Sequence, residues 1–126
     1  MDASALLCVL LNQGPRGIII SKTAGATLIA PGSLPWEIGN ALSSLMKRKK
    51  LSENAAAEAL DQYARIPIQL EEIEMKLVLS LVRKHMIYAY DGYMIVCAKN
   101  FRVPLLTLDE GMAAVAEKEN VRVVEV

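Results

Sequence analysis

The chain has 126 residues, of which 53% are hydrophobic and 22% charged, and its fourteen basic side chains balance its fourteen acidic ones. Disorder requires low hydrophobicity and high net charge, so this composition excludes it and predicts a single folded domain over residues 1–126. Domains that hold nucleic acid through bulk positive charge have a pI above about 9, whereas this sequence has a pI of 6.6. The high apolar fraction also predicts that a partner covers part of the surface.

The sequence predicts a cytoplasmic protein. No uncharged apolar run reaches the ~18 residues that a transmembrane helix needs, and the start lacks the positive region of a signal peptide. Cys8 and Cys97 lie far apart in apolar stretches and show no spacing typical of a metal site. We therefore expect both to be buried free thiols.

Helical patterns alternate with short apolar runs along the whole chain. Helices are expected over residues 3–12, 15–24, 35–50, 53–64, 71–85, 88–100 and 110–119. Strands are expected over residues 26–30, 66–70, 103–108 and 121–126. Continuous apolar strands that alternate with helices are typical of a parallel sheet covered on both faces, so we predict an α/β fold.

Four acidic residues fall near the expected carboxyl ends of strands or at helix starts, where open parallel sheets carry their sites. Asp109 follows the strand 103–108, Glu37 begins the helix after the strand 26–30, Asp2 precedes the first helix, and Asp91 lies early in an apolar helix. Each also has a structural explanation, because an acid in a first helical turn stabilises the helix by ~0.3–1 kcal/mol. The remaining central acids are assigned to a solvated surface: Glu53, Glu58, Asp61, Glu71, Glu72 and Glu74.

Convergence of the four acids would require a cation, since close carboxylates cannot all stay ionised alone. Oxygen ligands without histidine or cysteine suit hard ions, which predicts Mg²⁺ or Mn²⁺. Such a site can polarise a phosphodiester and activate a water for attack on phosphorus. The only histidine, His85, is explained as a cation at a helix end. Ser4, Ser33 and Cys8 lack partners for nucleophilic catalysis.

Short strings around these acids resemble the four acidic motifs of PIN domains, in the order and approximate spacing of that family. They are Asp2-Ala-Ser4, the octapeptide PWEIGNAL at 35–42, Tyr90-Asp91-Gly-Tyr93, and LLTLD at 105–109. The resemblance covers essentially the whole chain. It is strongest to the small PIN ribonucleases that act as VapC-like toxins of type II toxin–antitoxin pairs.

This resemblance implies a three-layer fold, with a parallel sheet of four to five short strands between helices. It implies a divalent-metal-dependent endoribonuclease that hydrolyses RNA phosphodiester bonds with Mg²⁺ or Mn²⁺. It assigns the metal site and the catalysis to Asp2, Glu37, Asp91 and Asp109. Asp2 and Asp91 would be direct ligands, and the other two would bind through water or orient the attacking water. The implied partners are an RNA substrate, a cognate antitoxin and a second copy in a homodimer.

Three further residues occupy the family's supporting polar positions: Ser4, Asn40 and Thr107. Thr107 also fits a capping box with Glu110. The basic run Lys47, Arg48, Lys49 and Lys50 is either an RNA contact or a solvated helix end. Residues 1–50 carry six basic and two acidic side chains, a net charge of +4 that can attract RNA. Trp36 either stacks on a base or belongs to the core or an interface, and we expect Tyr88, Tyr90 and Tyr93 to serve packing.

The sequence departs from the family pattern at its start. PIN domains carry a short apolar strand before the first Asp, central in the sheet, whereas only Met1 precedes Asp2 here. Either upstream residues are missing or the first strand is reduced to almost nothing, and both predict a weakly anchored Asp2. The alternative function is therefore a catalytically degenerate PIN-like module that binds protein or RNA. A phospho-acceptor receiver domain is disfavoured, because the expected paired acids and late lysine are absent.

Overall fold

The computed structural model describes residues 1–126 and contains seven helices and two paired strands. The helices are α1 (Ala3–Leu10), α2 (Arg16–Thr23), α3 (Leu34–Lys47), α4 (Glu53–Arg65), α5 (Met75–His85), α6 (Ala89–Phe101) and α7 (Glu110–Lys118). The strands are β1 (Leu28–Pro31) and β2 (Ile68–Glu71). Every predicted helix is present, and the α/β class is confirmed. None of the seven helices has the length and apolarity needed to cross a membrane.

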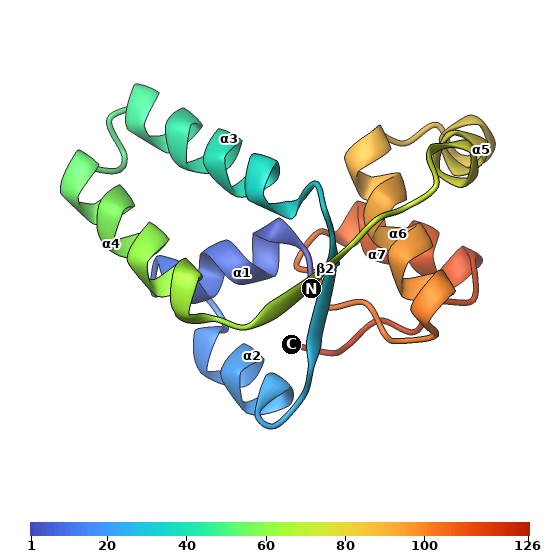
Figure 1. Cartoon of the computed structure of the whole chain (residues 1–126), viewed down its shortest axis with the longest axis horizontal. Helices are drawn as coiled ribbons and strands as arrows, with labels where there is room; N and C mark the ends of the chain where they lie inside the picture. Colours follow the sequence, from blue (N-terminus) through green and yellow to red (C-terminus); the bar gives the residue numbers. More distant parts are fainter.

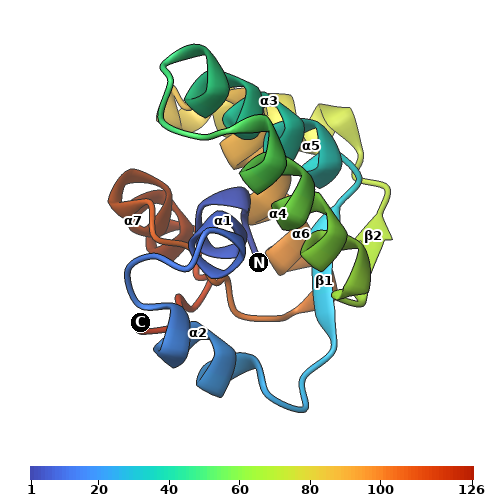
Figure 2. The ribbon, with the colours of Figure 1, turned by 90° about the vertical axis from the view of Figure 1, so that its left-hand side faces the viewer.

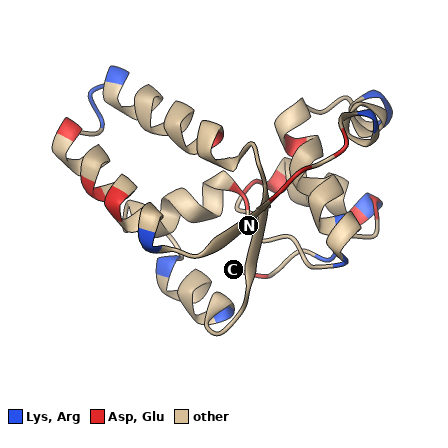
Figure 3. Cartoon of the chain, viewed as in Figure 1, with Lys and Arg blue, Asp and Glu red and all other residues tan.

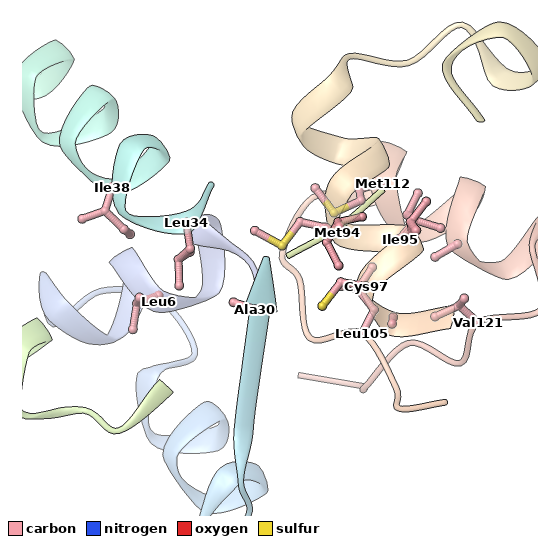
Figure 4. Packing of buried hydrophobic residues seen from close by; sticks show 14 of the residues in the cluster. Leu6, Ala30, Leu34, Ile38, Met94, Ile95, Cys97, Leu105, Met112 and Val121 are labelled. Carbon is pink, nitrogen blue, oxygen red and sulfur yellow. The ribbon is translucent and has the colours of Figure 1, made fainter. Parts of the chain in front are cut away.

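The strands lie between two groups of helices, with α1–α4 on one side and α5–α7 on the other (Figure 1). The loop between α3 and α4 lies at one end of the molecule and α2 at the opposite end (Figure 2). β1 stands between buried side chains of both groups: Leu34 and Ile38 on one side, Met94 and Ile95 on the other (Figure 4). Cys8 and Cys97 are buried free thiols, as expected.

The sheet is smaller than the four to five strands that the resemblance implies. β1 and β2 pair in parallel, with Leu28 opposite Ile68. The strands expected over 103–108 and 121–126 are extended segments joined by one parallel bridge, between Leu105 and Val123. Pro104 has no N–H group to donate, which limits pairing in the first of these segments. The sheet therefore has two strands and an interrupted second half.

Met1 and Asp2 lie between β1 and the segment 103–107 and form hydrogen bonds to both. The Met1 ammonium donates to the carbonyl oxygen of Ile29 at 3.1 Å. The Asp2 N–H donates to the carbonyl oxygen of Leu106 at 3.0 Å. Beside them lies a cavity of about 200 Å³, lined mainly by apolar residues of β1, α6 and the segment 103–106. Met1 and Asp2 thus connect β1 to this segment at the place where the ladder is interrupted.

The buried carboxylate of Glu119 joins the ends of α5, α6 and α7 within the second helix group. Glu119, just after α7, lies 2.8 Å from Lys84, His85 and Lys99, which belong to the last turns of α5 and α6. Hydrogen bonds from Lys84, then Lys99 and His85, lower the pKa of Glu119 to about 2. His85 therefore lies at a helix end, as expected, with a carboxylate as its partner. The cluster holds the carboxyl end of α6, whose opposite end carries Asp91.

Candidate active site

The starts of four helices meet near the carboxyl ends of the strands. α3 begins three residues after β1, α7 follows the segment 103–107, and α1 and α6 begin beside them. Acidic segments gather where β2 ends and where α3 and α6 begin, whereas lysines and arginines lie mainly at more distant helix ends (Figure 3). The predicted edge of the sheet is therefore the acidic part of the molecule, apart from the outer face of α4.

Asp2 is held more firmly than the sequence predicted. Its side chain caps α1 by accepting the Ala5 N–H at 3.0 Å. Ser4 Oγ lies 2.8 and 2.9 Å from the two carboxylate oxygens, and Thr107 Oγ1 donates to Oδ2 at 2.6 Å. Asp2 is only 2% exposed. The prediction of a weakly anchored Asp2 is therefore wrong, because side chains replace the backbone support of a long strand.

The same network connects the first and last motifs. The Leu108 N–H donates to Ser4 Oγ at 3.0 Å, and the Asp109 N–H donates to Thr107 Oγ1 at 3.0 Å. The N-cap of α7 is Asp109, whose Oδ1 accepts the Met112 N–H at 2.9 Å. The capping box predicted from Thr107 is therefore wrong, because the helix begins two residues later and its N-cap is Asp109. Thr107 instead supports Asp2, in line with the supporting role that the resemblance gave it.

Glu37 and Asp91 have carboxylates that are less engaged. Glu37 lies in the first turn of α3, where Ser33 Oγ donates to Oε2 at 3.3 Å. Burial, with smaller effects from Asp2 and Asp91, raises the pKa of Glu37 to about 7 despite that hydrogen bond. Asp91 lies in the first turn of α6, and burial, then Asp109 and Asp2, raise its pKa. All four acids stand at helix starts on the same edge of the sheet, and Asp2, Asp91 and Asp109 are near enough to act on the pKa of a neighbouring acid.

The donor set fits a hard divalent cation by its chemistry, since it consists of carboxylate oxygens. Asp91 accepts no side-chain hydrogen bond, and Glu37 accepts only that from Ser33. Asp2, in contrast, has hydrogen-bond donors on both oxygens. No three acids stand close enough to share one ion in this arrangement. The four acids therefore lie at the same edge of the sheet, but they do not surround a single point where one ion could bind them all.

Asn40 and the basic run lie along a neighbouring groove. This groove of about 590 Å³ runs between α1 and α3, and Ser4, Asn40 and Arg48 all line it. Asn40 is exposed one turn beyond Glu37, and its side chain makes no hydrogen bond to the acids. All four residues of the basic run, Lys47 to Lys50, are exposed. The groove joins the first motif to this run.

The aromatic residues differ most from the sequence interpretation. Trp36 is 70% exposed, so it does not belong to the core. Tyr88 is 85% exposed and Tyr90 is 47% exposed, so the packing role expected for these two is wrong, whereas Tyr93 is half-buried. Ser33 was considered only as a nucleophile, yet it is the hydrogen-bond partner of Glu37. Its position four residues before Glu37, one helical turn away, is the signal that could have revealed this.

Comparison with known proteins identifies the family. A sequence model of the PIN domain matches residues 1–118, so the chain belongs to the PIN domain family. The crystal structure of PAE2754 from Pyrobaculum aerophilum superposes with a TM-score of 0.71 and 22% sequence identity, covering 90% of this chain and 82% of that chain. At that identity the likeness shows the fold alone. A search of curated proteins found no match. PIN domains are generally nucleases, which gives the chain a nuclease-like fold.

The raised pKa of Glu37 makes a prediction for the metal-free protein. An acid whose pKa is raised from 4.5 to about 7 stabilises the fold fully below pH 4.5, and that contribution is lost as the pH rises through 7. In EDTA, Glu37→Gln should therefore exceed the wild type in unfolding free energy by about 1–2 kcal/mol at a pH near 8, with little difference near 5. Urea denaturation at the two pH values measures this.

Glu53→Gln is the matched control, because Glu53 is exposed at the start of α4. It should show no such pH-dependent gain. A Glu37→Gln protein that is less stable than the wild type near pH 8 would contradict the environment described for Glu37.

Proposed function

We propose that the chain is a divalent-metal-dependent endoribonuclease that hydrolyses RNA phosphodiester bonds. The observation that carries this proposal is the meeting of Asp2, Glu37, Asp91 and Asp109 at one edge of the sheet, where burial, and then neighbouring acids, raise the pKa of Glu37 and Asp91. Strongly perturbed carboxylates grouped at the carboxyl ends of strands are typical of active sites. The PIN family supports a nuclease.

The structure supports different tasks for these acids. Asp91 has unengaged carboxylate oxygens and is our first choice as a direct ligand of Mg²⁺ or Mn²⁺. Glu37, oriented by Ser33 Oγ, has a pKa near neutrality and can accept a proton from an attacking water at Oε1 or Oε2. Asp2 and Asp109 would add negative charge to a site that holds the ion. When bound, the ion would polarise the phosphoryl group and lower the pKa of a bound water.

The groove between α1 and α3 supports a path for the RNA backbone. It leads from Ser4 and Asn40 to Arg48, and the neighbouring lysines are exposed at the end of α3. Cations that contact phosphates make binding dependent on salt. A local basic run therefore reconciles RNA binding with a net charge of zero.

Cleavage of RNA tests this proposal. Purified protein should cleave RNA in Mg²⁺ or Mn²⁺ and not in EDTA. Asp91→Asn should lower the rate at least about 100-fold, because it removes the charge and one ligand oxygen from the site. Gel separation of labelled fragments measures both effects.

Asp61→Asn is the matched control, since Asp61 is exposed on the outer part of α4. It should cleave as the wild type does. Activity that persists in EDTA, or full activity in Asp91→Asn, would contradict the proposal.

A second candidate is a catalytically degenerate module that binds RNA or protein. Two observations favour it: no three acids are placed to share one ion, and the Asp2 oxygens are already occupied by hydrogen-bond donors. RNA binding without cleavage at any metal concentration would support this candidate.

We propose further that the protein is a toxin held inactive by a cognate antitoxin, and that it forms a homodimer. The support is an apolar stripe on α5, which packs mainly against α6 and forms the outer edge of its helix group (Figure 1). Met75 and Leu79 stand one turn apart on the helix, Met86 directly follows its last residue, and all three are exposed. Burial of such a stripe by a second chain is favourable.

Sedimentation tests the homodimer. The wild-type chain should sediment as a dimer at micromolar concentration, and Leu79→Glu should shift it towards the monomer because a charge enters the apolar stripe. Ser80→Glu changes a neighbouring exposed residue and should leave the dimer intact. A wild-type chain found only as monomer would refute this association.

A further inference from the structure

The cavity of about 200 Å³ between β1 and the segment 103–106 takes no part in the chemistry proposed above. One wall is β1 with the residues just before it, the other is Val103 to Leu106, and α6 closes the cavity with Met94, Cys97 and Ala98. Cys97 points from α6 towards β1 (Figure 4). Most of the lining side chains are apolar, so the cavity suits an apolar ligand.

Met1 and Asp2 show that the gap between the two walls is one strand wide. The Met1 ammonium donates to the carbonyl oxygen of Ile29 on one wall, and the Asp2 N–H donates to that of Leu106 on the other. A stretch of chain that bonds to both neighbours has the position of a strand, with ~4.8 Å to each of them. The cavity begins at Met1 and extends back along both walls.

Backbone groups on both walls have no hydrogen-bond partner in the protein. Leu105 directs its N–H and C=O away from the cavity, towards the segment 122–124. Because successive residues of an extended chain direct these groups to opposite sides, Pro104 and Leu106 present theirs to the cavity. The Leu106 N–H and the Pro104 C=O make no hydrogen bond, and neither do the N–H and C=O of Thr27 on the opposite wall. These groups suit a ligand that has a peptide backbone.

Charge selects the direction in which such a backbone lies. The Met1 ammonium stands at one end of the cavity, and its hydrogen-bond acceptor is the neutral carbonyl of Ile29. No acidic residue lines the cavity, and the nearby Asp2 carboxylate is engaged by Ser4 and Thr107. A strand parallel to β1 brings its carboxyl end to the ammonium, whereas the opposite direction brings a second amino group there. A free C-terminal carboxylate is therefore favoured.

We propose that this cavity binds the C-terminal segment of another protein, an extended run of about four small apolar residues that ends in a free carboxylate. The segment adds a parallel strand between β1 and the segment 103–106, and its main chain pairs with the open groups of both walls. Four residues span about 13 Å at ~3.3 Å per residue, which matches the four residues Ala26 to Ile29 that line one wall. An acyl chain would leave the backbone groups unpaired.

Peptide binding, measured without RNA or metal, tests this inference. The probe is the octapeptide GSGSVAVV, with fluorescein at its amino end and a free carboxyl end. We expect fluorescence anisotropy to show saturable binding to the wild-type chain below about 100 μM. The amidated peptide should bind at least about 10-fold more weakly, because a charge-assisted hydrogen bond is lost. N-methylation of the last two peptide groups should weaken binding at least as much, because it removes main-chain donors.

Variants of the protein locate the peptide. Ala98→Leu adds carbon atoms where Ala98 lines the cavity, and it should weaken binding at least about 10-fold. Ala114→Leu is the matched control, because Ala114 is exposed on α7 and does not line the cavity. Circular dichroism measures the folding of both variants, and the peptide variants test the same site on the unchanged chain. Saturating peptide should also raise the Tm of the wild type by about 5 °C or more.

The failure of this inference is distinct from that of the nuclease. No binding of the free-acid peptide up to millimolar concentration, or equal affinity for the amidated peptide, would overturn the strand site. Equal affinity of Ala98→Leu would place the peptide elsewhere and also overturn it. Octanoate that displaces the peptide, together with full affinity of the N-methylated peptide, would assign the cavity to small apolar carboxylates instead. Peptide binding by a chain that does not cleave RNA supports this inference and leaves the nuclease refuted.

Discussion

The structure depends on the link that Met1 and Asp2 make across the middle of the sheet. The Met1 ammonium donates to Ile29 in β1, and the Asp2 N–H donates to Leu106. Burial lowers the pKa of that ammonium. Side chains complete the link, because Ser4 and Thr107 both donate to the Asp2 carboxylate. The hydrogen bonds that close the sheet thus also position the first acid.

Asp2 therefore serves the fold and the site together. Its carboxylate caps α1 and accepts a hydrogen bond from Thr107. Its charge also helps to raise the pKa of Glu37 and Asp91. Burial and neighbouring negative charge that raise a carboxyl pKa destabilise the metal-free fold as the pH rises, and they favour a bound cation. The Glu119 cluster opposes this cost elsewhere, since Lys84, Lys99 and His85 surround one carboxylate and join the ends of α5, α6 and α7.

Much of the fold and of the candidate site could be predicted from local patterns. Helical periodicity placed all seven helices, and it put Asp2, Glu37, Asp91 and Asp109 at helix starts, because those starts can be read from neighbouring residues. The extent of the sheet could not be predicted, because pairing of the segment 103–108 depends on what fills the space beside β1. The hydrogen bonds that anchor Asp2 could not be predicted either, because one of them comes from Thr107, which lies 105 positions away in the sequence. The exposure of Trp36 reflects packing across α3 and α6, which local periodicity does not report.

The central claim is that the acidic edge of the sheet binds a divalent cation, with Asp91 as the first direct ligand. Calorimetric titration of the metal-free protein with Mn²⁺ tests it most directly, because binding is measured without any RNA. The account predicts saturable binding below millimolar Mn²⁺, and a loss of at least about tenfold in affinity for Asp91→Asn, with Asp61→Asn unchanged. No binding by the wild type up to millimolar Mn²⁺, or equal affinity in Asp91→Asn, would contradict it.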